Sequence, residues 1–294
     1  MKLNRLLSSS EPTLSFEVFP PKTSDTYASV ADAALRVADL KPHFMSVTCG
    51  AGGTTDRFTN DIASHIIRDK GVTAIEHITC VSARRESLQA HLDAVQEAGV
   101  ENVLALRGDL PEGYDPDAHH DFRHASELIT YIRANSELCI GGACYPEGHP
   151  ESPDVKTDID YIYEKQQAGC EFVTTQMFFD NNILYKYLYK LRSRGVTIPV
   201  VAGIMPVTNA AQLKRIRKLS GSHLPMKFLS MVDRFGNDPA AMRQAGVIYA
   251  TEQIVDLLAN GVTHIHVYSM NKPDVARQIR DSLNVILPTE AAAL

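Results

Sequence analysis

The sequence predicts a single (β/α)8 barrel over residues 1–294. Short β-rich runs alternate with longer helical patterns eight times in succession. Such alternation requires parallel crossovers, and eight units favour one closed barrel over a doubly wound sheet, which more often has fewer strands. The chain also shows no linker-like or low-complexity segment between these units. Its 294 residues suit a barrel, which typically needs about 250.

The first four predicted strands each end in proline, glycine or polar residues. We expect these strands at 14–19, 44–48, 74–79 and 102–106. Apolar residues recur at helical spacing after each of them, at about 26–40, 58–69, 85–98 and 125–134. A polar loop, 111–120, precedes the fourth helix.

The last four units repeat the pattern with one longer insertion. We expect strands at 139–145, 172–179, 199–204 and 264–269. The helices follow at about 155–168 and 182–194, then as a longer helical region within 209–260, and finally at 274–283. The tail, 288–294, is expected to be frayed.

Charge and hydropathy narrow the class of protein. The net charge is −6, from 29 basic and 35 acidic residues that are scattered without a block of one sign. This pattern argues against a nucleic-acid partner or an anionic membrane surface. No segment resembles a signal peptide or reaches the ~20 apolar residues of a membrane span, so we expect a cytoplasmic protein.

The cysteines and histidines give no metal-binding spacing. The five cysteines are odd in number and include no Cys-x-x-Cys pair, which is typical of reduced, buried thiols. The histidines lack an HExxH pattern, and the paired histidines at 119–120 fall in a loop. We therefore expect no metal site. A GxSxG serine nucleophile motif is also absent from the sequence.

Polar residues gather where the predicted strands end. In a (β/α)8 barrel the chemistry lies at this carboxyl end. Glu17 alternates with Phe16 in the first strand, so its side chain should face the barrel interior or its rim. Apolar surroundings would raise the pKa of its carboxyl and suit it to general acid catalysis, whereas the alternative is a core glutamate paired with a basic neighbour.

Three other features each leave two interpretations open. Arg107 and Asp109 form an ion pair or serve separate roles on the active face. The glycine-rich loop 50–55 is a plain loop or lets backbone amides approach a phosphate or ring, although it matches neither GxGxxG nor the P-loop. Asp158, Tyr161 and Lys165 share one helix face, which is either solvated or part of a binding site.

Seven segments together resemble the methylenetetrahydrofolate reductase family, in the family's order from about residue 14 to 285. They are FEVFPPKT (16–23), SVTCGA (46–51), HITC (77–80), LALRGDLP (104–111), ACYPEGHP (143–150), TQMFFD (175–180) and GIMPV (203–207). The length resembles the short bacterial form, which has the catalytic barrel and no regulatory domain.

The resemblance implies a barrel that holds FAD non-covalently at its carboxyl face. NADH or NADPH would reduce the flavin, and 5,10-methylenetetrahydrofolate would then enter the same pocket and become 5-methyltetrahydrofolate in a ping-pong cycle that feeds methionine synthesis. The family's bacterial members imply a homo-oligomer, with a tetramer as the expected form. The alternatives are another flavin barrel that reduces a C=N or iminium compound, and a folate- or flavin-binding protein without turnover.

The resemblance also implies roles for individual residues. Glu17 matches the general acid that opens the folate imidazolidine ring, and Asp109 matches an aspartate near the flavin pyrimidine ring and the pterin. Substrate contacts would further include Thr48, Gln176, Gln212 and Lys272. Flavin contacts would come from Thr48, Cys49, Ala51, His77, Arg107, Gly108, Asp109, Ala125, Tyr145, His149, Asp158 and Lys165.

The chain departs from the family pattern at several of these positions. Lys272 stands where an arginine is expected, so a substrate carboxylate would meet a point charge instead of a bidentate fork. Ile216 replaces a phenylalanine that would stack on a ligand. The other departures are Cys49, His124, Tyr161 and Glu164.

Overall fold

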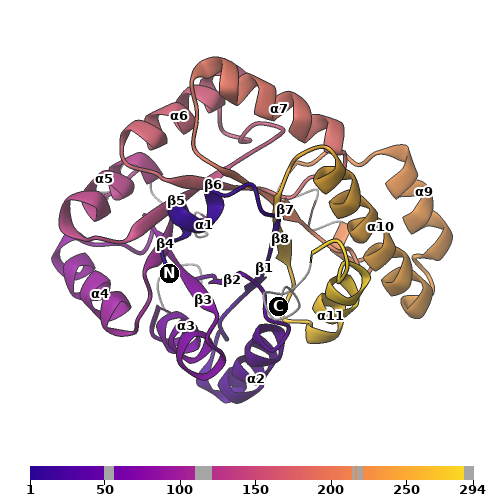
Figure 1. Ribbon diagram of the computed structural model, residues 1–294, viewed down its shortest axis with the longest axis horizontal. Coiled ribbons are helices and arrows are strands. Elements are labelled where there is room, and N and C mark those ends of the chain that lie inside the picture. Colours follow the sequence, from indigo (N-terminus) through magenta and orange to yellow (C-terminus); the bar gives the residue numbers. More distant parts are fainter. Residues whose placement is uncertain (50–55, 110–120, 214–215, 217–220, 288–294) are drawn as a thin grey trace.

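The computed structural model describes residues 1–49, 56–109, 121–213, 216 and 221–287. It confirms the predicted fold class. Eight parallel strands close into a barrel in the order β1-β2-β3-β4-β5-β6-β7-β8, and the larger helices surround it (Figure 1). The predicted glycine-rich loop 50–55, the polar loop 111–120 and the tail 288–294 lie outside the described residues.

The strands begin and end close to the predicted positions. They are β1 (Thr13–Val18), β2 (Phe44–Val47), β3 (Thr73–Thr79), β4 (Asn102–Leu106), β5 (Cys139–Cys144), β6 (Phe172–Thr175), β7 (Val200–Ile204) and β8 (His264–Tyr268). The main helices are α2 (Tyr27–Ala38), α3 (Asp56–Lys70), α4 (Arg85–Glu97), α5 (Ala125–Asn135), α6 (Val155–Gln167), α7 (Asn181–Arg194), α9 (Met226–Phe235), α10 (Pro239–Ala259) and α11 (Pro273–Ser282).

Strand β6 ends four residues before the predicted limit. The Gln176 N–H still donates to the Cys144 carbonyl at 2.7 Å, but the next N–H, that of Met177, donates to the Gln176 side chain at 2.9 Å. Phe178 and Phe179 are nevertheless buried, which explains why their apolar pattern resembled a strand. Burial alone does not distinguish a strand from a packed loop.

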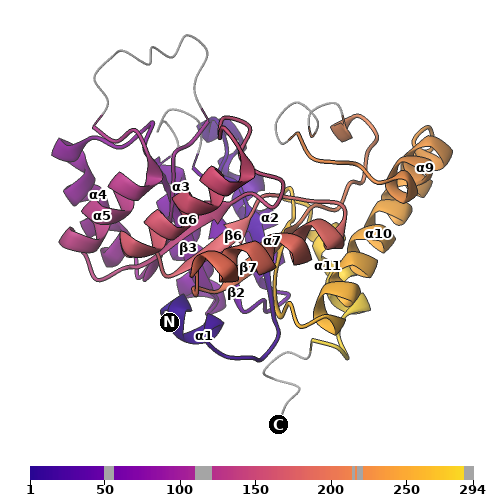
Figure 2. The same ribbon diagram turned by 90° about the horizontal axis from the view of Figure 1, so that it is seen from above.

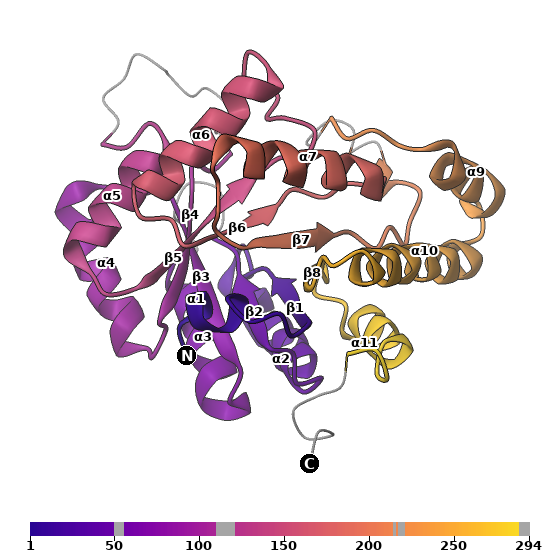
Figure 3. The ribbon, with the colours of Figure 1, turned by 45° about the horizontal axis from the view of Figure 1, so that its top comes forward.

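The predicted helical region 209–260 contains two long helices, α9 and α10, which pack against each other on the outer side of the barrel (Figure 3). Asp238 is the N-cap residue at which α10 begins, because its carboxylate accepts hydrogen bonds from the Ala240 and Ala241 N–H groups. Gly246 lets α10 approach the turn after β7: a Cβ atom there would lie 1.9 Å from the Val207 carbonyl oxygen.

A short helix that the sequence did not predict, α1 (Leu3–Leu7), lies at the amino end of the barrel (Figure 2). Its Leu3 and Leu7 side chains join a buried cluster with inward residues of six strands, and the Leu3 N–H donates to Asn102 Oδ1 at 2.7 Å. The helix therefore fills the end of the barrel opposite the strands' carboxyl ends.

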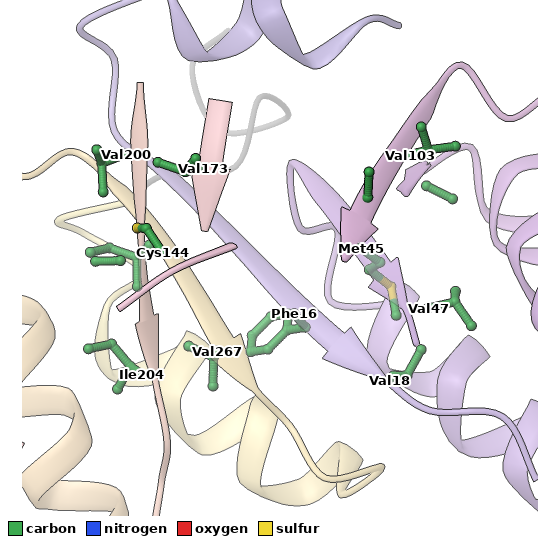
Figure 4. Close-up of a cluster of buried hydrophobic side chains, with 14 of the residues drawn as sticks. Phe16, Val18, Met45, Val47, Val103, Cys144, Val173, Val200, Ile204 and Val267 are labelled. Atoms are coloured by element: carbon green, nitrogen blue, oxygen red, sulfur yellow. The ribbon is translucent and has the colours of Figure 1, made fainter. Parts of the chain in front are cut away.

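The strands divide their side chains between two environments. Phe16, Val18 and Val267 belong to the apolar cluster between the strands and the surrounding helices (Figure 4). Because side chains alternate along a strand, the neighbouring Glu17 and His266 face the interior. The amino half of that interior holds the apolar cluster around α1 together with the buried polar side chains of Thr13, Asn102 and His264, and further polar residues occupy the half toward the carboxyl ends.

Candidate active site

A cavity of about 950 Å³ opens at the carboxyl ends of the strands. Most of the residues predicted for the site line it: Glu17, Thr48, Cys49, His77, Arg107, Gly108, Asp109, Ala125, Tyr145, His149, Asp158, Lys165 and Gln176. Ala51 lies outside the described residues. Gln212 and Lys272 are not among the described residues that line the cavity.

Glu17 lies at the inner end of this cavity, between β2 and β8. The strand register places it beside Ser46 on one side and Tyr268 on the other. The Ser46 hydroxyl donates to Glu17 Oε2 at 3.3 Å, and the Nε2 atoms of His77 and His266 each lie 3.7 Å from the same oxygen. The carboxyl thus accepts a hydrogen bond from Ser46 and lies beside two imidazole rings, with its side chain 22% exposed.

The predicted rise in the pKa of Glu17 is wrong for this ligand-free protein. Burial does raise the pKa, but the close approach and electrostatic influence of His266, the electrostatic influence of His77 and the Ser46 hydroxyl together outweigh burial and place the pKa below its usual value. Burial lowers the pKa of His77 to about 4, so His77 is neutral at neutral pH. Glu17 is therefore a carboxylate at neutral pH.

A chain of polar side chains continues from Glu17 into the barrel. The Ser15 hydroxyl donates to the Ile265 carbonyl at 2.9 Å and lies 2.7 Å from His266 Nδ1. His266 Nε2 then faces the Ser46 hydroxyl at 3.0 Å. The sequence analysis missed Ser46 and His266. Their alternation pointed inward, but only the strand register shows that they meet Glu17.

Arg107, at the end of β4, forms its ion pair with Glu151 and not with Asp109. Both guanidinium Nη atoms hydrogen-bond to the two Glu151 carboxylate oxygens, one at 2.9 Å. This fork raises the pKa of Arg107 and lowers that of Glu151. Asp109 is exposed on the cavity wall, where a carboxylate can act on a bound ligand.

The loop between β5 and α6 places Glu151 in the lining of the cavity. His149 packs edge-on against Tyr145, with ring centroids 4.6 Å apart, and its Nδ1 accepts the Glu151 N–H at 3.1 Å. Gly148 has φ +86°, a conformation that suits glycine. Sequence reasoning missed Glu151, although it directly follows the HP pair of the family-like segment.

The Asp158 and Lys165 face of α6 points to the cavity, which resolves the two interpretations left open by the sequence. Asp158 is 3% exposed and accepts a hydrogen bond from the Ser152 hydroxyl at 3.0 Å. Its second oxygen, Oδ2, is buried without a hydrogen-bond partner. Lys165 donates to the Ala143 carbonyl at 2.8 Å, and burial lowers its pKa. A buried carboxylate oxygen left unpaired is costly, so this wall suits a ligand that donates a hydrogen bond.

Gln176 and the two outer residues present amide and ammonium groups. The Gln176 Oε1 is taken by Met177, which leaves its Nε2 as the remaining polar end at the cavity. Gln212 Oε1 accepts from the Thr208 N–H at 3.1 Å, and Lys272 Nζ donates to the Thr208 hydroxyl at 2.9 Å. Thr208 therefore joins Gln212 and Lys272 into one group outside the cavity lining.

The departures from the family pattern also have places in the structure. Cys49, His124, Tyr161 and Glu164 line the cavity. Ile216 does not; it is buried in a separate apolar cluster with Phe228 and other residues of α9 and α10. All five cysteines are free thiols, and burial raises the pKa values of four of them.

No group of three or more His, Cys, Asp or Glu side chains in the part of the chain that the structure covers is arranged to hold a metal ion. Within the same residues, no helix is both long and apolar enough to cross a membrane.

A family model described as methylenetetrahydrofolate reductase matches residues 2–284. Methylenetetrahydrofolate reductase 1 of Schizosaccharomyces pombe is 35% identical over 278 residues, which cover 93% of this chain and 46% of that protein. The 5,10-methylenetetrahydrofolate reductases of Pectobacterium carotovorum and Escherichia coli are 34% and 31% identical, and each match covers 92% of this chain and 90% of the relative. The chain thus spans about half the length of the S. pombe relative and most of the bacterial ones.

Solved structures also resemble the barrel over nearly its whole length. One of them is described as an uncharacterized protein from Clostridium thermocellum that binds two copies of 5-methyl-5,6,7,8-tetrahydrofolic acid. The TM-score is 0.68 with 14% identity, and the match covers 97% of this chain and 99% of that one. At this identity the likeness shows the fold alone.

Proposed function

This chain belongs to the methylenetetrahydrofolate reductase family, and we propose that it reduces 5,10-methylenetetrahydrofolate to 5-methyltetrahydrofolate with NADH or NADPH. The observation that carries the proposal is the meeting of Glu17, Asp109 and Gln176 at one cavity. These are the three residues at which the sequence matches the family's reacting groups. We further propose that residues 1–294 act as one catalytic domain, with a homo-oligomer as its assembly.

The cavity fits a non-covalently bound FAD, which would supply the hydride transfer between the two substrates. Its volume of about 950 Å³ lies at the upper end of the range for cofactor sites. The unpaired Asp158 Oδ2 is a buried acceptor for a ribose hydroxyl, and Lys165 adds a cation on the same wall. Thr48, Cys49, His77, Arg107, Gly108, Ala125, Tyr145 and His149 are the further flavin contacts in this proposal.

Glu17 is the proposed general acid for opening the imidazolidine ring of the folate. Its lowered pKa makes it a carboxylate at neutral pH, so it must gain a proton when the substrate binds. Burial is the largest influence on its pKa and acts upward. A substrate that covers the exposed 22% of the side chain removes its remaining water and strengthens this influence. The His266–Ser46 contacts hold the carboxyl in place for the transfer.

Asp109 and Gln176 act on the substrate from the other walls of the cavity. The Asp109 carboxylate stabilises the cationic iminium that ring opening creates, because opposite charges attract strongly where water is excluded. The Gln176 amide donates to the pterin or to the nicotinamide carboxamide. Gln212 and Lys272 contact the more distant parts of the folate.

An absorbance experiment tests this proposal directly. Purified protein, loaded with FAD, is mixed anaerobically with NADH and then with 5,10-methylenetetrahydrofolate. We expect the flavin absorbance to bleach with NADH and to return with the folate. A protein that takes up no FAD contradicts the cofactor assignment. Bleaching without return on folate addition would favour a reductase of another C=N compound, and FAD uptake without bleaching would favour a binding protein.

A further inference from the structure

The turn between β8 and α11 contains two consecutive residues in the left-handed conformation. Met270 has φ 53° and Asn271 has φ 51°. They are two of only three non-glycine residues with positive φ in the described parts of the chain. Such conformations are strained for L residues and persist only where their surroundings impose them.

Contacts with the end of β1 hold Asn271 in this conformation. Its Oδ1 accepts the Phe19 N–H at 2.9 Å, and its Nδ2 donates to the Phe19 carbonyl at 2.8 Å. The β1–β8 ladder ends with the pair Glu17–Tyr268, so Phe19 lies beyond the last strand partner. The Asn271 side-chain amide thus takes the place of a peptide group and continues the pairing between the ends of β1 and β8.

Asparagine meets two requirements here that few residues meet together. Its side-chain amide is both donor and acceptor, which pairing with both backbone groups of Phe19 demands. It also tolerates the left-handed conformation better than other residues with a Cβ atom. An alanine would lose the amide and a glycine would lose the amide while relieving the strain.

The same turn also hydrogen-bonds to the Glu17 backbone and positions the Lys272 side chain. The Ser269 hydroxyl donates to the Glu17 carbonyl at 2.6 Å, and the Ser269 N–H contacts the same oxygen at 3.3 Å. The Lys272 N–H closes the turn on the Ser269 carbonyl at 3.0 Å. The Lys272 side chain then reaches Thr208, beyond the end of β7, at 2.9 Å. One strained turn therefore connects the ends of β1, β8 and β7.

We propose that Asn271 is a positioning residue for folate reduction: its clamp on Phe19 fixes the distance between Glu17 and Lys272. The inference rests on the proposed function, in which Glu17 protonates the folate and Lys272 binds a distant part of it. The flavin contacts proposed above come from β3, from the loops after β2, β4 and β5, and from α5 and α6, whereas this turn follows β8. Loss of the clamp should therefore affect the folate step and spare flavin reduction.

The test compares Asn271→Gly with the wild-type holoenzyme in the two half-reactions. Glycine keeps the left-handed backbone without strain, so the variant isolates the loss of the two hydrogen bonds. We expect kcat/KM for 5,10-methylenetetrahydrofolate to fall about 10-fold or more, since small misplacements of reacting groups have large effects. The rate of flavin bleaching by NADH should stay within about twofold of wild type.

Asn260→Gly is the matched control. Asn260 also donates through its side-chain amide to a backbone oxygen, that of Asp256 at 2.8 Å, but it does so at the end of α10 that precedes β8. Both half-reactions should be unchanged in this variant. If Asn271→Gly fails to fold, Ser269→Ala replaces it, because it removes the hydroxyl grip on Glu17 and should show the same selective loss.

Either of two results overturns the positioning role: a folate kcat/KM within twofold of wild type, or an equal fall in both half-reactions. A wild-type protein that binds FAD and is bleached by NADH, but is not reoxidised by the folate, overturns the proposed function itself. In the first case the wild type still turns over the folate, so the two failures are distinguishable.

Discussion

Replacement of Asp158 by asparagine should weaken FAD binding while leaving the ligand-free fold intact. Asp158 is 3% exposed, with one oxygen bonded to Ser152 and the other, Oδ2, unpaired. An unsatisfied buried acceptor costs about 1–3 kcal/mol, and asparagine removes its charge. The carboxylate lies in the first turn of α6, where a negative charge contributes about 0.3–1 kcal/mol to helix stability. The first effect stabilises the variant and the second destabilises it, so their contributions to the free energy of unfolding oppose each other.

The effect on FAD binding has one direction, because the substitution can only weaken the hydrogen bond from the ligand. A hydrogen bond from a ribose hydroxyl is worth about 1.5–3 kcal/mol with the charged Oδ2 as acceptor and about 0.5–1.5 kcal/mol with a neutral amide oxygen, so the substitution should raise the Kd for FAD by about 5- to 13-fold. The Kd is measured by titrating the FAD-free protein with FAD and following the quenching of flavin fluorescence. The free energy of unfolding is measured by urea denaturation of the same FAD-free protein, and we expect it to change by less than about 1.5 kcal/mol.

Asp160→Asn is the control for this variant, because Asp160 lies on the same helix but pairs with Arg194 at the surface. Its FAD affinity should equal that of the wild type. An Asp158→Asn protein that binds FAD as tightly as the wild type but unfolds far more readily would refute the reasoning. Asp158 would then be a structural residue, and its unpaired oxygen would not mark a ligand site.

Four further predictions follow from the described contacts. Glu17→Gln should leave flavin bleaching by NADH intact and abolish folate reduction in single-turnover assays; folate reduction near the wild-type rate would disprove the acid role. Asp109→Asn should raise the flavin reduction potential, measured by dye-coupled titration, and slow the folate half-reaction; an unchanged potential would remove its electrostatic role. Because the pKa of His77 falls from 6.5 to about 4 on folding, the unfolded chain binds more protons between these values, and stability should drop by up to about 3 kcal/mol as pH falls from 6.5 to 4. A His77→Gln variant should flatten this dependence in urea denaturation, and a slope like that of the wild type would exclude His77 as its cause. Gly246→Ala should lower the free energy of unfolding by about 2 kcal/mol despite the higher helix propensity of alanine, since its Cβ would lie 1.9 Å from the Val207 oxygen; equal stability would show that α10 can shift freely.

The barrel was predictable because its signals are local. A strand such as β1 shows its inward and outward faces in successive residues, so Glu17 could be placed on the interior from the sequence alone. Most strand and helix limits follow from the same short-range periodicity and from the glycines and prolines that interrupt it. The short helix α1 escaped prediction because five residues carry too little periodicity.

The surroundings of each predicted residue depend on contacts between distant parts of the chain. The sequence identified Glu17 but not the direction of its pKa shift, because that direction depends on Ser46 and His266, which only the strand register brings beside it. It identified Arg107 but not its partner Glu151, 44 positions later. Local spacing determines which side chains face the interior, whereas barrel closure determines which of them meet. Hydrogen bonds and pKa values arise from those meetings, so only the tertiary structure could decide them.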